Sequence, residues 1–200
     1  MAIAPVAFPP YSRRMSIAVA HGHPFSIDDL DQFPDDDGLR YELIEGTLIV
    51  STSPTLLHQR AVTRMLLLLA AVCPPELEVL PGPIDVVLAP ATMVAPDAVL
   101  ARTADVGGRR FDEALPLLVI EVISPSSRLI DPNTKRAAYR ASGVEGYWIV
   151  DPIEPSVRVI RWAADGNTEH EAFVSGDDTL VIDWPLNVEL CPARLVSDQR

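Results

Sequence analysis

Cysteine is scarce in this chain of 200 residues, which has only Cys73 and Cys191. Two cysteines make neither a disulfide framework nor a metal cluster, so we expect a reducing, cytoplasmic environment. The apolar run at 65–72 is too short to span a bilayer and is typical of a buried helix. The N-terminus has no basic start followed by an unbroken apolar core, which argues against a signal peptide. The composition therefore predicts a cytoplasmic protein without a membrane segment.

Positive charge is also in short supply. The chain has 16 Lys and Arg residues against 28 Asp and Glu residues, which gives a net charge of −12. Non-specific binding to nucleic acid depends on neutralising phosphates, so this balance argues against a protein that coats DNA. The charge is uneven, however, because residues 128–140 carry four basic residues and one acid. A local contact with a phosphate backbone is therefore compatible with the sequence.

Lysine is the scarcest basic residue, because Lys135 stands alone beside fifteen arginines. Arg and Lys serve equally well as solubilising surface charges. They differ where chemistry needs a compact ammonium on a flexible stem. Either the composition left one Lys by chance, or position 135 requires an ammonium.

The patterns that are present predict one α/β (α+β) domain at residues 25–200, preceded by a flexible arm at 1–24. Two strands around a turn at Glu45-Gly46 are predicted within 40–51. A helix follows, with Ser53 as its cap and Pro54 at its first position. Further strands are predicted at 78–82, 84–89, 97–101, 115–123, 146–151, 156–162 and 170–176, with an edge strand within 179–190.

A second helix is predicted between two of these strands. Asp131 would cap it, Pro132 would open it and Gly143 would end it. Strands separated by helices in this order are typical of a mixed sheet flanked by two main helices.

Glu121 is the most unusual residue of the predicted sheet, because it lies inside the apolar strand at 115–123. Strand alternation places Leu117, Val119, Glu121 and Ile123 on one face. Burying a carboxylate costs several kcal/mol unless a cation or hydrogen-bond donors compensate it. We therefore expect a positive group beside Glu121.

Asp97 is the second candidate acid. If the strands at 97–101 and 117–123 pair antiparallel, Asp97 and Glu121 meet at one edge of the sheet. Two close carboxylates repel each other, and a divalent ion such as Mg²⁺, which prefers oxygen ligands, relieves that repulsion. Lys135, in the first turn of the next helix, would reach the same place.

These residues resemble a known family. The resemblance covers about residues 25 to 162 and rests on an ordered set of motifs: YELIEG (41–46), His58, VAPDAVL (94–100), PLLVIEVISPSSR (116–128), the K-x-x-x-Y of Lys135 and Tyr139, and GVEGYWIVDP (143–152). Their order and spacing are similar to the PD-(D/E)XK nuclease superfamily, and more closely to its Uma-type branch of putative restriction endonucleases. The resemblance implies a restriction-endonuclease-like mixed β-sheet flanked by helices, with additional β-hairpins.

One position departs from the superfamily pattern. The third element should read acid, any residue, lysine, and here it reads Glu121-Val122-Ile123. In the Uma-type branch the lysine lies in the following helix, where this chain has Lys135. The only lysine of the chain therefore falls where the resemblance expects a catalytic amine.

The resemblance implies a metal-dependent endonuclease that hydrolyses DNA to a 5′-phosphate and a 3′-hydroxyl. Asp97, Glu121 and the carbonyl of Val122 would hold Mg²⁺ (or Mn²⁺). Lys135 would assist the attacking water. Such enzymes often form homodimers to reach both strands, so a homodimer is expected, without a small organic cofactor.

Several further residues receive roles with a structural alternative beside each. Glu42 would be an acid of the metal site or an outward-facing hairpin residue, and His58 a site residue or a satisfied helix histidine. Tyr139 lies one helical turn after Lys135 and would orient it or contact phosphate, unless it belongs to the core. Three arginines would contact DNA phosphates or else form a solvated face, namely Arg128, Arg136 and Arg140.

Three other functions remain open. The first is a nuclease-fold protein with little or no cleavage activity, which would bind nucleic acid or protein. The second is a two-carboxylate glycoside hydrolase, disfavoured because only 6% of the residues are aromatic. The third is an interaction protein in which Glu121 pairs with Arg128 or Arg136 for stability alone.

Overall fold

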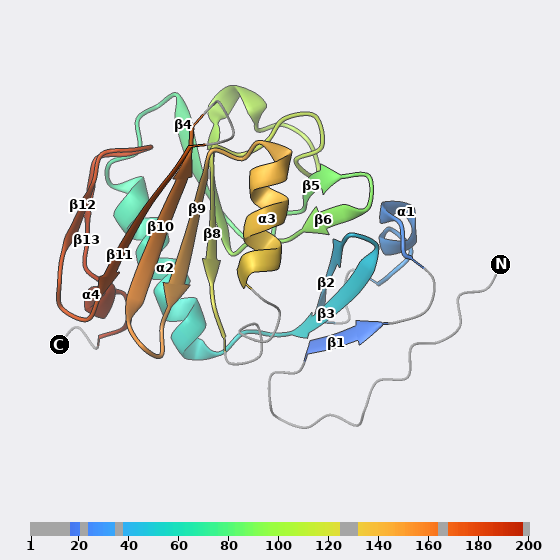
Figure 1. Cartoon of the computed structure of the whole chain (residues 1–200), viewed down its shortest axis with the longest axis horizontal. Coiled ribbons are helices and arrows are strands. Elements are labelled where there is room, and N and C mark those ends of the chain that lie inside the picture. The colour runs from blue at the N-terminus through green and yellow to red at the C-terminus, as the bar shows by residue number, and fades with distance from the viewer. Residues whose placement is uncertain (1–16, 21–23, 35–37, 125–131, 164–167, 198–200) are drawn as a thin grey trace.

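A six-stranded mixed sheet is the largest element of the computed structural model, which describes residues 17–20, 24–34, 38–124, 132–163 and 168–197 (Figure 1). Its strand order is β11-β10-β9-β8-β7-β4. The strands are β4 (Leu77–Pro81), β7 (Ala98–Arg102), β8 (Leu118–Val122), β9 (Gly146–Asp151), β10 (Ser156–Trp162) and β11 (Glu169–Ser175). All neighbours run antiparallel except β8 and β9, which run parallel. The mixed sheet confirms the predicted fold class.

Two helices cover opposite faces of this sheet. In Figure 1, α3 (Pro132–Ser142) lies in front of the strands and α2 (Leu56–Ala70) lies behind them. The side chains of β8 alternate between two cores, because Leu118 packs in the core that α2 shares and Val119 in the core that contains Tyr139 of α3. The alternation explains why apolar residues occupy both faces of this strand.

A second sheet stands beside the first, with strand order β1-β3-β2-β6-β5. Its strands are β1 (Ile17–Ala20), β2 (Leu39–Ile44), β3 (Thr47–Thr52), β5 (Val86–Ala89) and β6 (Thr92–Val94). Beside it lies the short helix α1 (Ile27–Leu30), which buries Leu30 in a third, smaller core together with Phe25 and Leu43. The β2–β3 hairpin turns at Glu45 and Gly46, whose φ angles are 49° and 76°, as the sequence predicted.

The start of α2 differs from the sequence-based prediction. Thr55, and not Ser53, is the N-cap, since the Thr55 hydroxyl accepts a hydrogen bond from the His58 amide at 3.2 Å. Pro54 lies before the cap and Leu56 is the first helical residue. Both Ser53 and Thr55 are good capping residues, so the sequence alone did not decide between them.

Both ends of the chain contain elements that the sequence analysis missed. Residues 17–20, inside the segment assigned to a flexible arm, form β1 and pair with β3. The predicted edge strand within 179–190 is instead a separate pair, β12 (Leu180–Ile182) with β13 (Val188–Leu190). It is followed by the short helix α4 (Pro192–Val196). A 3₁₀ turn, η1 (Thr103–Asp105), follows β7.

The second helix largely follows its prediction. It begins at Pro132, and Gly143 follows its last residue with a φ of 95°, a conformation that favours glycine. The predicted cap, Asp131, lies outside the described residues. The result that matters for the site is that α3 carries Lys135 across the face of β8.

Candidate active site

Asp97 and Glu121 lie side by side at one end of the β7–β8 pair, as the antiparallel pairing predicted. Ala98 pairs with Ile120, so Asp97, one residue before β7, lies beside Glu121 and Val122. The Asp97 amide donates to the Ile120 carbonyl at 3.1 Å. Both carboxylates are buried, with 4% of Asp97 and 7% of Glu121 exposed.

Three donors hold the Asp97 carboxylate. Its Oδ2 accepts a hydrogen bond from the Val122 amide at 2.9 Å and lies 3.2 Å from Nε2 of His58. Its Oδ1 accepts from Arg40 at 3.1 Å. Burial alone would raise the pKa of Asp97, but the His58 hydrogen bond and the Arg40 charge outweigh it and lower that pKa to about 2. Asp97 is therefore a carboxylate at every physiological pH.

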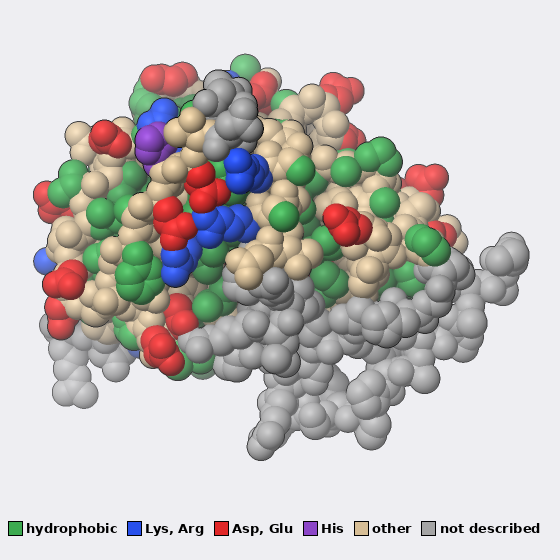
Figure 2. Space-filling view, in the orientation of Figure 1, with side chains coloured by type: hydrophobic (Ala, Val, Ile, Leu, Met, Phe, Trp, Pro, Cys, Tyr) green, Lys and Arg blue, Asp and Glu red, His purple; other side chains and the backbone are tan. Residues whose placement is uncertain are grey.

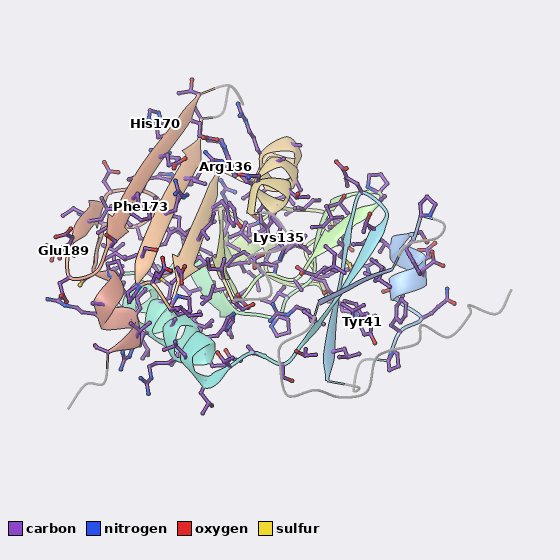
Figure 3. All side chains as sticks on the ribbon, turned by 60° about the horizontal axis from the view of Figure 1, so that its bottom comes forward. Tyr41, Lys135, Arg136, His170, Phe173 and Glu189 are labelled. Carbon is purple, nitrogen blue, oxygen red and sulfur yellow. The ribbon has the colours of Figure 1, made fainter. Side chains whose placement is uncertain are left out.

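Lys135 joins the other two acids. Its Nζ donates to Oε1 of Glu121 and to Oε1 of Glu42, each at 2.8 Å. The two carboxylate oxygens therefore lie no more than twice that distance apart. Glu42 comes from β2 and also accepts from the Ala95 amide at 2.9 Å. The ammonium thus links the two sheets through α3, and Figure 3 shows Lys135 on the side of α3 that faces the small sheet.

Tyr139 completes the surroundings of Glu121. One helical turn after Lys135, its hydroxyl donates to the same Oε1 at 2.8 Å, and its side chain is fully buried. Its ring packs against Tyr147 of β9, with ring centroids 4.9 Å apart. Tyr139 therefore belongs both to the core and to the site, which the sequence analysis had treated as alternatives.

The protonation states follow from burial and from these neighbours. Burial would lower the pKa of Lys135, but Glu121 and Glu42 outweigh it and raise that pKa, so the side chain is an ammonium. Burial raises the pKa of Glu121, Lys135 opposes the rise, and the charges of Glu42 and Asp97 reinforce it. Tyr139 keeps its proton, because burial and the charge of Glu121 raise its pKa well above the usual value.

The donor set suits an oxygen-preferring divalent ion. Glu42, Asp97 and Glu121 supply carboxylate oxygens, the ligands that Mg²⁺ prefers in proteins. In the described residues, however, no group of three or more Asp, Glu, His or Cys side chains is arranged to hold a metal ion. Lys135 and Arg40 provide the positive charge beside these carboxylates instead. The chemistry of the acids therefore fits Mg²⁺, and a cation of the protein lies between two of them.

The arginines predicted to contact phosphate lie elsewhere. Arg136 leaves α3 toward β11 and pairs with Glu169 and Glu171, the latter at 2.7 Å (Figure 3). Arg140 is 4.0 Å from Glu169. Figure 2 shows this mixture of acidic and basic side chains gathered beside α3. Arg128 lies outside the described residues, and contact of Arg136 or Arg140 with DNA stays a prediction.

Comparison with known protein families identifies the family of this chain. Residues 27–191 match the Uma2 family, described as putative restriction endonucleases. The chain belongs to the Uma2 family. The match includes every segment that builds the site, namely β2, α2, the residue before β7, β8 and α3. The resemblance drawn from the motifs is thereby confirmed.

The fold has a counterpart among solved structures. The crystal structure of a putative nuclease belonging to DUF820 from Anabaena variabilis ATCC 29413 matches with a TM-score of 0.70 and 18% identity. The match covers 86% of this chain and 98% of that one. A search of curated proteins found no match. Within the described residues, no helix has the length and apolar character needed to cross a membrane.

Arg40 is the site residue that sequence reasoning missed. It lies two positions before Glu42, so strand alternation places both side chains on one face of β2. That spacing was the available signal, but a lone arginine ahead of an acidic motif is common. In this Uma2 protein Arg40 is the guanidinium that holds Asp97, with 24% of its side chain exposed.

Proposed function

We propose that this protein is a divalent-metal-dependent endonuclease that hydrolyses phosphodiester bonds of DNA. The observation that carries the proposal is the ammonium of Lys135 between Glu42 and Glu121, with Asp97 alongside. Burying these charges carries a desolvation penalty that apolar residues of similar size would avoid, so stability alone does not explain the cluster. Perturbed ionisable groups of this kind are typical of active sites. The family and the fold point to the same chemistry.

Each residue of the site takes a role consistent with its contacts. Asp97, Glu121 and the carbonyl of Val122 would hold Mg²⁺ (or Mn²⁺), which supplies Lewis-acid charge beside the scissile phosphate. Arg40 and His58 fix the orientation of the Asp97 carboxylate, and Tyr139 fixes that of Glu121.

Lys135 acts as a cation in this proposal and not as a base, because its raised pKa keeps it protonated. It orients the attacking water and stabilises the negative charge that develops on the phosphate oxygens. Glu42 keeps the ammonium in place. The products are a 5′-phosphate and a 3′-hydroxyl, and a homodimer would allow both strands to be cut.

The test combines metal binding with cleavage. Mg²⁺ and Mn²⁺ are titrated calorimetrically into wild type, Asp97→Asn, Glu121→Gln and Lys135→Ala. We expect the two acid variants to lose metal binding and Lys135→Ala to keep it while losing cleavage. Glu189→Gln, a change of the same kind at an exposed position of β13, is the matched control and should behave as wild type. Wild-type protein that binds neither ion at millimolar concentration, with or without oligonucleotide, would exclude the proposal.

A second candidate is a nuclease-fold binding module without robust cleavage. It is favoured by the absence, in the described part of the chain, of a preformed cluster of three metal ligands and by the net charge of −12. It predicts that the protein binds nucleic acid or a protein partner equally well with and without divalent ions and cuts nothing. The cleavage assay with Glu121→Gln separates the two candidates.

A further inference from the structure

A cavity of about 290 Å³ lies along the edge of β2, next to the candidate active site. Its wall includes Phe33, Arg40, Tyr41, Asp85 and Arg109. A smaller cavity of about 160 Å³ shares Leu39, Arg40 and Pro83 with it and is lined by Asp97. Arg40 therefore stands at the border between the larger cavity and the opening that leads to the catalytic carboxylate.

The position of this cavity follows from the pairing of β2. Side chains alternate along a strand, so Arg40 leaves one face of β2 and Tyr41 the other. Pairing of β2 with β6 is confined to Leu43 and Met93. The edge of β2 at Leu39 to Glu42 is thus not covered by β6, and the cavity borders side chains of both faces. A ligand along this edge would contact Arg40 at one end and Tyr41 at the other.

The aromatic part of the wall is suited to a planar ring. Phe33 and Tyr41 stack on each other with centroids 4.6 Å apart and an interplanar angle of 16°. Both residues are only partly buried, and both line the cavity. Nucleobases stack on such aromatic surfaces with little regard to sequence, because every base has a π face.

The charged residues of the wall nearly cancel one another. The wall contains two arginines, Arg40 and Arg109, and two aspartates, Asp31 and Asp85. Outside the wall, Asp97 pairs with Arg40 and Arg110 pairs with Asp31. The interior is therefore nearly neutral overall, which disfavours a phosphate and admits an uncharged base. Arg40, at the border with the Asp97 cavity, is the group placed to meet the phosphate.

We propose that this cavity is a nucleobase subsite and that the protein binds an unpaired nucleotide of single-stranded nucleic acid there. The base stacks on the Phe33–Tyr41 pair and its phosphate meets Arg40 on the way to Asp97. A base that is paired and stacked in a duplex cannot enter such a cavity. The net charge of −12 agrees with this assignment, since stacking supplies affinity without neutralising many phosphates.

The inference rests on the proposed nuclease function, because the subsite is placed by its position beside the catalytic acids. It is tested without cleavage, in EDTA, by fluorescence anisotropy of a labelled single-stranded oligodeoxynucleotide of about 12 nucleotides. The variants are Tyr41→Leu, which keeps apolar volume but removes the ring, and Tyr41→Phe, which keeps the ring. Thermal unfolding of each variant establishes that it is folded.

We expect wild type and Tyr41→Phe to bind the single strand alike, and Tyr41→Leu to bind it roughly tenfold more weakly. A duplex of the same sequence should bind more weakly than the single strand. The inference is overturned if wild type does not bind the single strand, if folded Tyr41→Leu binds as wild type does, or if the duplex binds as tightly. If binding depends on the ring but no cleavage is found, the subsite is supported and the nuclease function is excluded. If the protein cleaves DNA but Tyr41→Leu binds as wild type does, the nuclease function is supported and the subsite is excluded.

Discussion

Replacing Lys135 by Met tests the central feature of the site, since it removes the ammonium and keeps most of the side-chain volume. The variant leaves Glu42 and Glu121 buried and close together without their shared cation. Removing one partner of a buried ion pair costs about 3–5 kcal/mol, whereas an exposed pair contributes about 0–1 kcal/mol. Only 14% of the Lys135 side chain is exposed. We therefore expect the free energy of unfolding to fall by about 3 kcal/mol near neutral pH.

The pH dependence of this loss distinguishes a buried charge from a packing defect. Burial already raises the pKa of Glu121 and the charge of Lys135 opposes that rise, so without Lys135 this pKa rises further and the folded variant binds more protons than its unfolded chain. Its stability therefore increases as the pH falls, and the deficit relative to wild type narrows toward about pH 5. A cavity left by missing atoms would instead cost the same at every pH.

The assay is urea unfolding of wild type and Lys135→Met between about pH 5 and pH 8. Arg158→Met is the matched control, because Arg158 pairs with Glu171 while 40% of its side chain is exposed. We expect this control to lose at most about 1 kcal/mol, with little change over the same pH range. The reasoning is refuted if Lys135→Met is as stable as wild type near neutral pH, or if its deficit does not narrow on acidification.

Two further predictions concern Asp97. Its pKa is lower in the folded protein than in the unfolded chain, so the Asp97 carboxylate stabilises the fold at any pH above the unfolded-state pKa. That stabilisation is lost as the pH falls from about 4 to about 2. The stability of wild type relative to Asp97→Asn should shrink by about 2 kcal/mol over this range, measured by urea unfolding, and a constant difference would contradict it. Gly82→Ala should displace Asp97 and lower both the melting temperature and metal binding, since an added Cβ would lie 2.0 Å from the Pro96 carbonyl oxygen. Gly107→Ala, with nothing within 4 Å of the added atom, should leave both unchanged.

The sequence predicted the parts of the site that strand periodicity controls. Glu121 interrupts an apolar strand and therefore had to meet a cation, and pairing of the flanking strands was sufficient to place Asp97 beside it. The uniqueness of Lys135 indicated which cation that would be. These inferences needed only the alternation of side chains and the cost of burying a charge.

Other features depended on long-range packing and left little trace in the sequence. The role of Arg40 depends on how β2 of the small sheet lies against the end of β7, whereas its spacing from Glu42 indicates only the face of the strand. The separate β12–β13 pair resembled an edge strand because its alternation is that of any short strand. The N-cap of α2 is Thr55, and local capping preferences do not distinguish it from Ser53, because both residue types cap helices well.

The position of Lys135 on α3 means that the site is completed late in the order of the chain. Glu42, Asp97 and Glu121 all precede α3 in the chain, and β9, β10 and β11 all follow it. A fragment that stops after β8 would hold all three acids but not the ammonium that Glu42 and Glu121 share, and β8 would remain a hydrophobic edge. Docking of α3 supplies the missing charge, and the parallel return into β9 covers that edge. A piece of this protein must therefore extend from β2 through α3 to contain the whole site, and it must reach β9 to cover the edge of β8.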